Sequence, residues 1–552
     1  MGKLFVLLSM LASSVVFANE ISVRTLQCGT SNCGTPIHDH GIHGEGQVIA
    51  VLDTGLDYDN CYFAEADGSA PPVNTGTPAG GFAFSNVNAN RRKVIAYDFL
   101  YSCEQYPGAS GCENPSNPFD WDNQGHGTHA AASAVADRGA PIAHDYGDAI
   151  ATGAKLVVQD AGFIGGDNCS QRPGIGCPVA MAPILEQAYL QGARIHSNSW
   201  GDRQGVPQPG TPPTANYSAS ARDIDAFVFS HPDLLVVFNT GNYGANTPPP
   251  ASTLSAPGCA KNALQVGGTR VIGREDDILT GFTLSGPSRD GRIKPDLVGP
   301  AYVVAGDTDG DVRTSNCSLS PQGGTSWSSP SVAGAAALVR QYYADGFYPS
   351  GVAKSSDRFT PSAALLKATL IAAARPVMTR YTASGEIAAQ PVPSNEQGFG
   401  FPVLHDVLHF PGDRTQLRIA DVPTAAGIAQ SESVSTRLKV RSGSPLRMTL
   451  VWTDPAGVPR SASDATPELI NDLDLRIIDP AGNTRYGNES LHPGRADRLN
   501  NVEVVSVPAP ASGTWTITID GARLGQGPRQ GYALVATGDF TTLVSRARAV
   551  GH

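Results

Sequence analysis

Short apolar runs recur between helix-like stretches in the first half of this chain. A strand that is apolar along most of its length must be covered on both faces, which is typical of a parallel sheet with helices on either side. The runs lie at residues 47–52, 155–159, 194–197, 234–238 and 263–266. They predict an α/β fold with a doubly wound, mostly parallel sheet.

Polar residues follow two of these runs. Asp53 comes directly after the first run, and Asn242 follows the fourth by a few residues. Ligands of open α/β sheets bind at the carboxyl ends of the strands. We therefore expect Asp53 and Asn242 in one functional site.

A candidate nucleophile stands at the start of a predicted helix. Gly323-Gly324-Thr325-Ser326 leads into a small-residue run whose apolar members have helical spacing. Glycines allow close approach of a ligand, and a helix N-terminus favours negative charge, so Ser326 is well placed to attack a substrate. A serine needs a base, and His126 in Gly125-His126-Gly127-Thr128-His129 opens another predicted helix.

The order of these groups along the chain is Asp, His, Ser, which is the order in subtilisin. Asp53-Thr54-Gly55, the His-Gly-Thr-His block at 126–129 and the Gly-Thr-Ser-x-x-x-Pro block at 324–330 resemble the signature blocks of the subtilase (subtilisin-like serine protease) family. The segment 236–242 resembles the strand and loop that carry the oxyanion-hole asparagine of this family, which maps onto Asn242. The resemblance covers about residues 47–401.

The resemblance implies a role for each residue. His126 would take the proton of the Ser326 hydroxyl, and Asp53 would orient the imidazole. Asn242 and the Ser326 backbone N–H would stabilise the oxyanion. The local alternatives are His129 for the base, Asp57 or Asp59 for the acid and Asn239 for the amide.

Asn198-Ser199-Trp200-Gly201 resembles the family segment that pairs with an extended substrate beside the specificity pocket. We predict Ser199, Trp200 and Gly201 as substrate-binding residues, with a core position as the alternative for Trp200. The side-chain preference stays open, as does the choice between endopeptidase and aminopeptidase-like action.

The predicted function is that of a secreted serine endopeptidase that hydrolyses peptide bonds of proteins through an acyl-enzyme intermediate. An aspartic protease would need a second Asp-Thr-Gly, and an α/β-hydrolase would need Gly-x-Ser-x-Gly with the histidine last. A binding protein on an inactive protease scaffold is the alternative from another class. All four catalytic positions carry the expected residue types, which favours the enzyme.

The pattern of apolar and polar residues changes past residue 410. Alternating runs separated by turn residues predict an all-β sandwich or barrel. They lie at 436–440, 447–453, 473–478, 502–507 and 514–519. Blocks at 450–455, 471–475 and 486–488 resemble the β-sandwich or jelly roll appended to some larger subtilases, to which we assign no catalysis.

The N-terminus has a short basic start and an apolar run that ends in Val16-Phe17-Ala18, which indicates a secretory signal peptide at 1–18. The further predicted units are a lead at 19–46, a catalytic domain at 47–414 with an inserted loop region at 57–121, a sandwich at 415–540 and a tail at 541–552. Cleavage after Ala18 would leave only 53 − 19 = 34 residues before the acid. That is short for a pro-domain, so we expect folding without one.

The balance of charge bears on partners and location. The net charge is −11, and no basic stripe is present to neutralise phosphates. We therefore expect protein or peptide substrates, no nucleic acid, no stable membrane association and a monomer in the extracellular space or periplasm.

Nine cysteines follow the predicted signal peptide. The local disulfide candidates are Cys28 with Cys33, Cys103 with Cys112 and Cys169 with Cys177. Because nine is odd, at least one thiol is free or pairs elsewhere.

Three groups of histidine or aspartate residues contain side chains of the types that bind metal ions. The histidines His38, His40 and His43 are better interpreted as part of a polar surface lead than as a metal site. The acidic clusters at 307–311 and at Asp472 and Asp474 lack a full ligand set, so solvated turns are favoured and structural calcium is the alternative. No cofactor is expected for catalysis.

Overall fold

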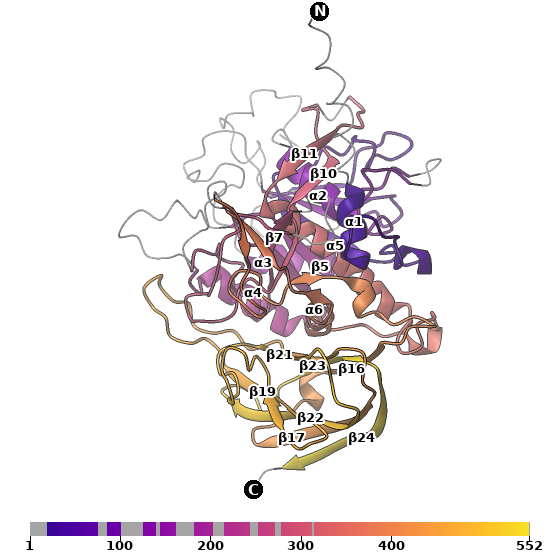
Figure 1. Ribbon diagram of the computed structural model, residues 1–552. Helices are drawn as coiled ribbons and strands as arrows, with labels where there is room; N and C mark the ends of the chain where they lie inside the picture. Colours follow the sequence, from indigo (N-terminus) through magenta and orange to yellow (C-terminus); the bar gives the residue numbers. More distant parts are fainter. Residues whose placement is uncertain are drawn as a thin grey trace, which may run out of the picture.

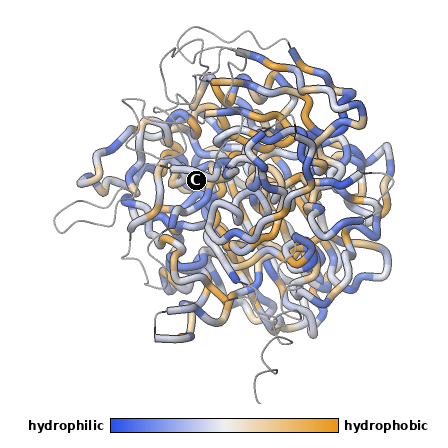
Figure 2. Tube along the Cα trace, turned by 90° about the horizontal axis from the view of Figure 1, so that it is seen from above, coloured by the Kyte–Doolittle hydropathy of each residue, from blue (hydrophilic) through white to orange (hydrophobic). Residues whose placement is uncertain are grey.

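The computed structural model describes residues 19–75, 86–100, 125–139, 144–161, 181–201, 215–242, 252–270, 278–311, 314–382 and 384–550, with 542–550 described by their backbone alone. An α/β unit comes first along the chain, and a unit of β-strands lies beneath it in Figure 1. Figure 2, seen from above, has hydrophobic segments gathered towards the interior and hydrophilic ones along much of the rim.

The α/β unit is built around one large sheet with the strand order β14-β13-β8-β7-β6-β5-β1-β4-β3-β2. All neighbours from β2 to β7 are parallel, and β9 also pairs in parallel with β7. Antiparallel pairs occur where β7 meets β8 and where β13 meets β14. The strands are β1 (Val48–Asp53), β2 (Val73–Thr75), β3 (Val94–Phe99), β4 (Lys155–Asp160), β5 (Ile195–Asn198), β6 (Leu235–Asn239), β7 (Leu264–Arg270), β8 (Ile278–Leu279), β9 (Leu297–Pro300), β13 (Thr379–Thr382) and β14 (Gly385–Ala388).

Helices cover both faces of this sheet, as the apolar strands predict. The longer helices are α1 (Asn19–Cys28), α2 (His126–Val135), α3 (Met181–Leu190), α4 (Ala219–Ser230), α5 (Thr325–Ala344) and α6 (Ala363–Ala372). The helices α2 and α5 pack together, and α5 contacts β5, β6, β7 and β9, while α3 packs against α4. Ala50 of β1 clusters with Ala188 of α3, whereas its neighbours Ile49 and Val51 belong to the main core. The doubly wound α/β fold is therefore confirmed.

Short strands complete the unit. A hairpin of β10 (Tyr302–Gly306) and β11 (Leu319–Gly323) leads into α5, and β12 (Ala374–Arg375) pairs with β15 (Phe401–Pro402). The hairpin ends directly before the segment that carries the predicted nucleophile.

The region 57–121 differs from the expected inserted loop. Its strand β3 is buried along its whole length and lies between β2 and β4 in the large sheet. Asp98 interrupts the apolar pattern of β3, but Asn74 and Gln191 each donate a hydrogen bond of 2.8 Å to its carboxylate. A buried carboxylate with such donors is compatible with a core strand, and sequence pattern alone does not reveal the donors. The rest of the region, with Cys103 and Cys112, lies outside the described residues.

The predicted lead is not a surface segment. The helix α1 buries Val23 and Leu26 in the main core and contacts α5 and β10. Asn19 is buried and donates to the carbonyl oxygens of Ala132 at 3.1 Å and Gly147 at 3.2 Å. The lead is thus part of the α/β unit, because helical spacing within it presents an apolar face to the core.

The histidines of this lead point to different neighbours. The His38 Nε2 atom lies 2.8 Å from the Ile150 carbonyl oxygen, and burial lowers the pKa of His38 to about 4. His40 stacks on Phe410 at a centroid distance of 3.8 Å, and His43 lies 4.6 Å from the ring of His38. Across the described residues, no three His, Cys, Asp or Glu side chains are grouped so as to hold a metal ion.

The C-terminal unit consists of two antiparallel sheets, with strand orders β16-β23-β18-β21 and β20-β19-β22-β17-β24. The strands are β16 (Gln416–Val422), β17 (Glu432–Val440), β18 (Leu446–Val451), β19 (Asn471–Ile478), β20 (Thr484–Tyr486), β21 (Val502–Val507), β22 (Gly513–Leu524), β23 (Tyr532–Gly538) and β24 (Phe540–Val550). Trp452 and Trp515 are buried in the core of this unit. The all-β region is confirmed, and β24 runs through residues assigned above to a tail.

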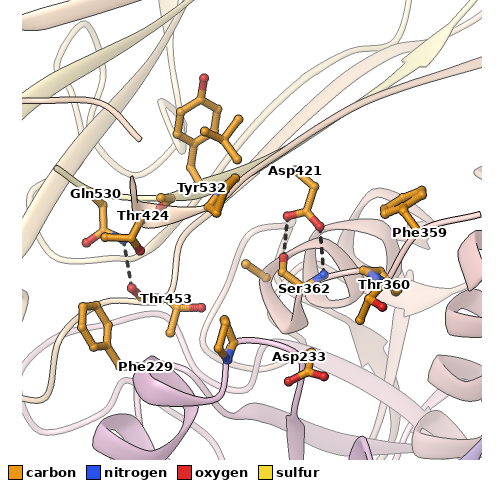
Figure 3. Close-up of a pocket in the computed structure, with 16 residues that line it drawn as sticks. Phe229, Asp233, Phe359, Thr360, Ser362, Asp421, Thr424, Thr453, Gln530 and Tyr532 are labelled. Carbon is orange, nitrogen blue, oxygen red and sulfur yellow. Dashed lines mark hydrogen bonds between the residues drawn. The ribbon is translucent and has the colours of Figure 1, made fainter. Parts of the chain in front are cut away.

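The helix α6 joins the two units. It contacts α5 and β6 on one side and β18 and β23 on the other. Asp421 of β16 accepts hydrogen bonds from the backbone N–H of Ser362 at 2.9 Å and from its hydroxyl at 2.6 Å, at the start of α6 (Figure 3). A cavity of about 390 Å³ lies at this junction.

Two disulfides lie within the described residues. Cys28 pairs with Cys33, as predicted, while Cys61 pairs with Cys317 across 256 residues, which was not predicted. Cys259 is a buried free thiol. Cys169 and Cys177 lie outside the described residues. None of the described helices has the length and apolar character needed to cross a membrane.

Candidate active site

A buried carboxylate and a half-buried imidazole meet at the carboxyl end of β1. Asp53 is the last residue of β1 and only 1% exposed, whereas the His126 side chain, in the first turn of α2, is 34% exposed. The His126 Nδ1 atom lies 2.6 Å from Asp53 Oδ1, which also accepts a 2.8 Å hydrogen bond from the Thr54 backbone N–H. This contact holds the ring by Nδ1 and fixes its orientation.

The two sequence motifs around Asp53 and His126 contact each other through their backbones. The Gly127 backbone N–H donates to Thr54 Oγ1 at 2.8 Å. A Cβ atom on Gly127 would lie 2.1 Å from the Gly55 carbonyl oxygen, so no larger residue fits there. Glycine at 127 therefore allows the start of α2 to approach the loop after β1.

Ser326 lies in the first turn of α5 and is 7% exposed. Its hydroxyl donates to the Ser199 carbonyl oxygen at 3.4 Å, and the Ser199 hydroxyl donates to the Ser326 carbonyl oxygen at 2.6 Å. The end of β5 is thus attached to the start of α5. The predicted substrate-binding segment therefore runs beside the predicted nucleophile.

The orientation of the Asn242 amide follows from its hydrogen bonds. Its Oδ1 atom accepts from the Thr325 backbone N–H at 2.9 Å and from the Thr325 hydroxyl at 3.0 Å. The Nδ2 group is therefore directed elsewhere, and it lies 3.6 Å from the position of a Cβ atom built on Gly324. Asn239, the alternative, is buried in β6 and donates to Thr325 Oγ1 at 3.4 Å.

The geometry also distinguishes His126 from His129 as the candidate base. His129 is fully buried, and its Nε2 atom lies 3.1 Å from the Ser320 carbonyl oxygen. Burial lowers the pKa of His129 to about 4, so this imidazole stays neutral at pH 7. The Nε2–H of His129 donates to the Ser320 carbonyl oxygen, so this nitrogen has no lone pair for the Ser326 proton, and burial disfavours the imidazolium that a base must form. Both points favour His126 as the base.

The alternative acids are engaged elsewhere. Asp57 Oδ2 accepts from the Asn316 side chain at 3.1 Å and from the Asp309 backbone N–H at 3.2 Å. Burial, and then the hydrogen bond and charge of Asp57, raise the pKa of Asp59 to about 7. Asp53, by contrast, contacts the imidazole of His126.

Comparison with known proteins shows the family to which the chain belongs. The profile of the subtilase family matches residues 44–400, which is more than half of the chain. The chain belongs to the subtilase family. Its fold class, predicted from the apolar runs and from the alternating runs past residue 410, is that of a subtilase domain followed by an all-β region.

Several relatives of this subtilase are proteases by name. The serine protease/ABC transporter B family protein tagA of Dictyostelium discoideum is 26% identical over 637 residues, covering 96% of this chain and 32% of that protein. Subtilisin-like protease SBT2.1 of Arabidopsis thaliana is 32% identical over 103 residues, covering 18% of this chain and 12% of that protein. The chain spans about a third of the length of tagA and of the similar proteins tagD and tagB. The solved serine protease of Aeromonas sobria covers 94% of this chain with 95% of its own, at 16% identity and a TM-score of 0.39.

One site residue of this subtilase escaped the sequence analysis. Trp327 follows Ser326 directly, is 3% exposed, and places its ring 4.9 Å from the His126 ring and 4.2 Å from the His129 ring, measured between centroids. Its position directly after the predicted nucleophile indicated that Trp327 lies near the site. The direction of its indole, however, depends on the packing of α2 against α5.

The contacts of Trp200 and Gly201 fit a substrate-binding position and a core position equally well. The ring of Trp200 packs edge-to-face on Phe238 at a centroid distance of 5.4 Å, which fits the core alternative as well. A Cβ atom on Gly201 would lie 2.0 Å from Ser255 Oγ. The roles of Ser199, Trp200 and Gly201 stay predictions.

The two acidic clusters are held by protein groups. Asp472 and Asp474 both form ion pairs with Arg498, at 3.1 Å for Asp472. In the cluster at 307–311, Asp309 accepts from the Asp311 backbone N–H at 3.0 Å and from the Thr314 hydroxyl at 2.8 Å. These contacts suit the turn interpretation, and structural calcium stays a prediction.

Proposed function

We propose that this chain is a serine endopeptidase that hydrolyses peptide bonds of proteins with Asp53, His126 and Ser326 as its catalytic triad. The observation that carries the proposal is the 2.6 Å contact between the buried Asp53 carboxylate and the half-buried His126 ring, with Ser326 on the helix packed against α2. Family membership supports the same activity.

In the proposed reaction, Ser326 Oγ attacks the substrate carbonyl carbon while His126 Nε2 takes its proton. Asp53 accepts the Nδ1–H hydrogen bond, fixes the tautomer and stabilises the imidazolium that forms. His126 then protonates the leaving amine as the peptide C–N bond breaks. Water, deprotonated by His126, hydrolyses the resulting acyl-enzyme.

The oxyanion of each tetrahedral intermediate needs hydrogen-bond donors. Asn242 Nδ2 and the Ser326 backbone N–H are the proposed donors, because Thr325 fixes the amide orientation and N–H groups in the first helical turn lack intrahelical partners. Loss of one such donor costs about 10² to 10³ in rate, a magnitude measured in subtilisin itself.

An extended substrate would lie along Ser199, Trp200 and Gly201, next to Ser326. We further propose that the protein acts outside the cytoplasm as a monomer, without stable membrane association and without a cofactor for catalysis. Calcium would affect only its stability, and addition of a chelator during thermal unfolding tests this directly.

Hydrolysis of denatured casein by the parent protein and by Ser326→Ala tests the proposal. A fluorophosphonate probe with peptide mapping locates the reactive serine, and Ser356→Ala, at an exposed 3₁₀ turn, is the matched control. We expect cleavage and labelling at Ser326 in the parent and control only. A folded parent that neither cleaves nor labels would contradict the proposal and favour an inactive binding scaffold.

A further inference from the structure

Three donor nitrogen atoms surround one point beside the predicted nucleophile. A Cβ atom built on Gly324 would have as its nearest neighbours Asn242 Nδ2 at 3.6 Å, Trp327 Nε1 at 3.6 Å and the Ser326 backbone nitrogen at 3.8 Å. All three are nitrogen atoms that donate hydrogen bonds. Two of them are the oxyanion donors proposed above, and the third belongs to the indole of Trp327.

The indole N–H of Trp327 is an unpaired donor within the described part of the chain. Trp327 is 3% exposed, and its Nε1 atom is buried without a hydrogen-bond partner among the described residues. A buried tryptophan N–H normally finds an acceptor, because leaving a buried donor unpaired costs about 1 to 3 kcal/mol. The indoles of Trp452 and Trp515 donate to carbonyl oxygens at 2.8 Å and 2.9 Å. The Trp200 Nε1 atom is buried without a partner among the described residues, as is that of Trp327, but the nitrogen of Trp327 is the one that lies beside the two proposed oxyanion donors.

The orientation of this indole is held by its surroundings. Its ring contacts both His126 and His129, and its backbone N–H donates to the Gly324 carbonyl oxygen at 3.2 Å. His129 is itself fixed through the Ser320 carbonyl oxygen. The unpaired donor is thus held in place before any substrate binds, as electrostatic catalysis requires.

We propose that the Trp327 indole N–H is a third donor to the oxyanion, beside Asn242 Nδ2 and the Ser326 backbone N–H. This inference rests on the proposed function. Negative charge on the former carbonyl oxygen exists only while the tetrahedral intermediate does, so the unpaired N–H finds its acceptor at that stage. The contribution therefore falls on kcat and much less on KM.

Replacement of Trp327 by phenylalanine removes the N–H and keeps an aromatic ring against the two histidines. We expect kcat to fall about 10- to 100-fold, with KM and the pH profile of kcat/KM little changed. Trp515→Phe removes an indole N–H in the C-terminal unit and is the matched control, with unchanged kcat. A merely structural Trp327 would instead shift the pH profile through His126 or lower thermal stability alone.

A second variant tests the position of the oxyanion without touching Trp327. Gly324 has an extended φ of 167°, and a methyl group there would make contacts of 3.6 Å or longer, so Gly324→Ala should fold normally. The methyl group would occupy the point that the three donor nitrogen atoms surround. We expect at least about a 100-fold loss of kcat/KM, while Gly34→Ala, where a Cβ meets nothing within 4 Å, retains activity.

A measurement on the parent protein completes the test. In ¹⁵N-indole-labelled protein, reaction of Ser326 with a fluorophosphonate puts a phosphonyl oxygen among the three donors. We expect the Trp327 indole proton, assigned by its absence in Trp327→Phe, to move downfield. An unmoved resonance, or a Trp327→Phe variant that keeps parental kcat, would overturn the inference and leave the proposed protease intact. A parent protein that neither cleaves nor labels would overturn both.

Discussion

Lys261 and Asp454 form a buried ion pair between the two units, and its disruption should be costly. Both side chains are fully buried. The Lys261 ammonium donates to Asp454 Oδ2 at 2.5 Å and to the carbonyl oxygens of Pro455 at 2.5 Å and Glu468 at 2.8 Å. The three acceptors all lie in the C-terminal unit, so the charge of Lys261 is neutralised across the junction.

Asp454→Asn keeps the size of the side chain and removes its charge. The fully buried ammonium would then face only neutral oxygen atoms, which costs about 3 to 5 kcal/mol of unfolding free energy. Lys261→Met has a similar cost, because Asp454 would keep only the backbone N–H groups of Ile470 at 2.9 Å and Asn471 at 2.7 Å. Native proteins have total stabilities of about 5 to 15 kcal/mol, so either loss is large.

The double variant Lys261→Met with Asp454→Asn removes both charges. We expect it to be less destabilised than the sum of the single variants by about 2 kcal/mol or more, since no buried charge remains unpaired. Urea unfolding in a Ser326→Ala background avoids self-digestion. Far-ultraviolet circular dichroism and tryptophan fluorescence must coincide for a two-state treatment. Additive single effects, or a cost below about 1 kcal/mol for Asp454→Asn, would refute the reasoning.

Further predictions concern pH, the long disulfide and the approach of α2. Burial raises the pKa of Asp98 to about 7, so protonated Asp98 is favoured in the folded protein. The contribution of Asp98 to the free energy of unfolding is therefore complete below about pH 4 and is lost as the pH rises through 7. Asp98→Asn should therefore match the parent near pH 4 in urea unfolding and exceed it by up to about 4 kcal/mol at pH 8, and a pH-independent difference would contradict this assignment. Replacement of Cys61 and Cys317 by serine opens a loop of 256 residues and should lower the unfolding free energy by up to about 5 kcal/mol in non-reducing urea titrations, whereas no change would show that the two thiols are unpaired in solution. In Gly127→Ala the new methyl group would overlap the Gly55 carbonyl oxygen, so we expect kcat/KM for a peptide substrate to fall at least about 100-fold, and retained activity would mean that α2 tolerates a shift at His126.

The sequence was most informative where structure depends on local pattern. The apolar runs identified β1, β4, β5, β6 and β7, and the alternating runs identified the main strands of the C-terminal unit. Each motif of the site also has its own local geometry, a strand end for Asp53 and helix starts for His126 and Ser326. Periodicity and turn chemistry involve neighbours in the chain, so they can be interpreted before the fold is known.

Features that depend on contacts between distant segments were not accessible in this way. The strand β3 is stabilised in the core by donors to Asp98, α1 is buried by the surfaces of α5 and β10, and Cys61 meets Cys317 because the loop after β1 lies beside the β10–β11 hairpin. The unpaired indole N–H of Trp327 belongs to the same class. Such contacts arise from the order of strands in the sheet and the packing of helices upon it, and no spacing along the chain encodes which distant groups will meet.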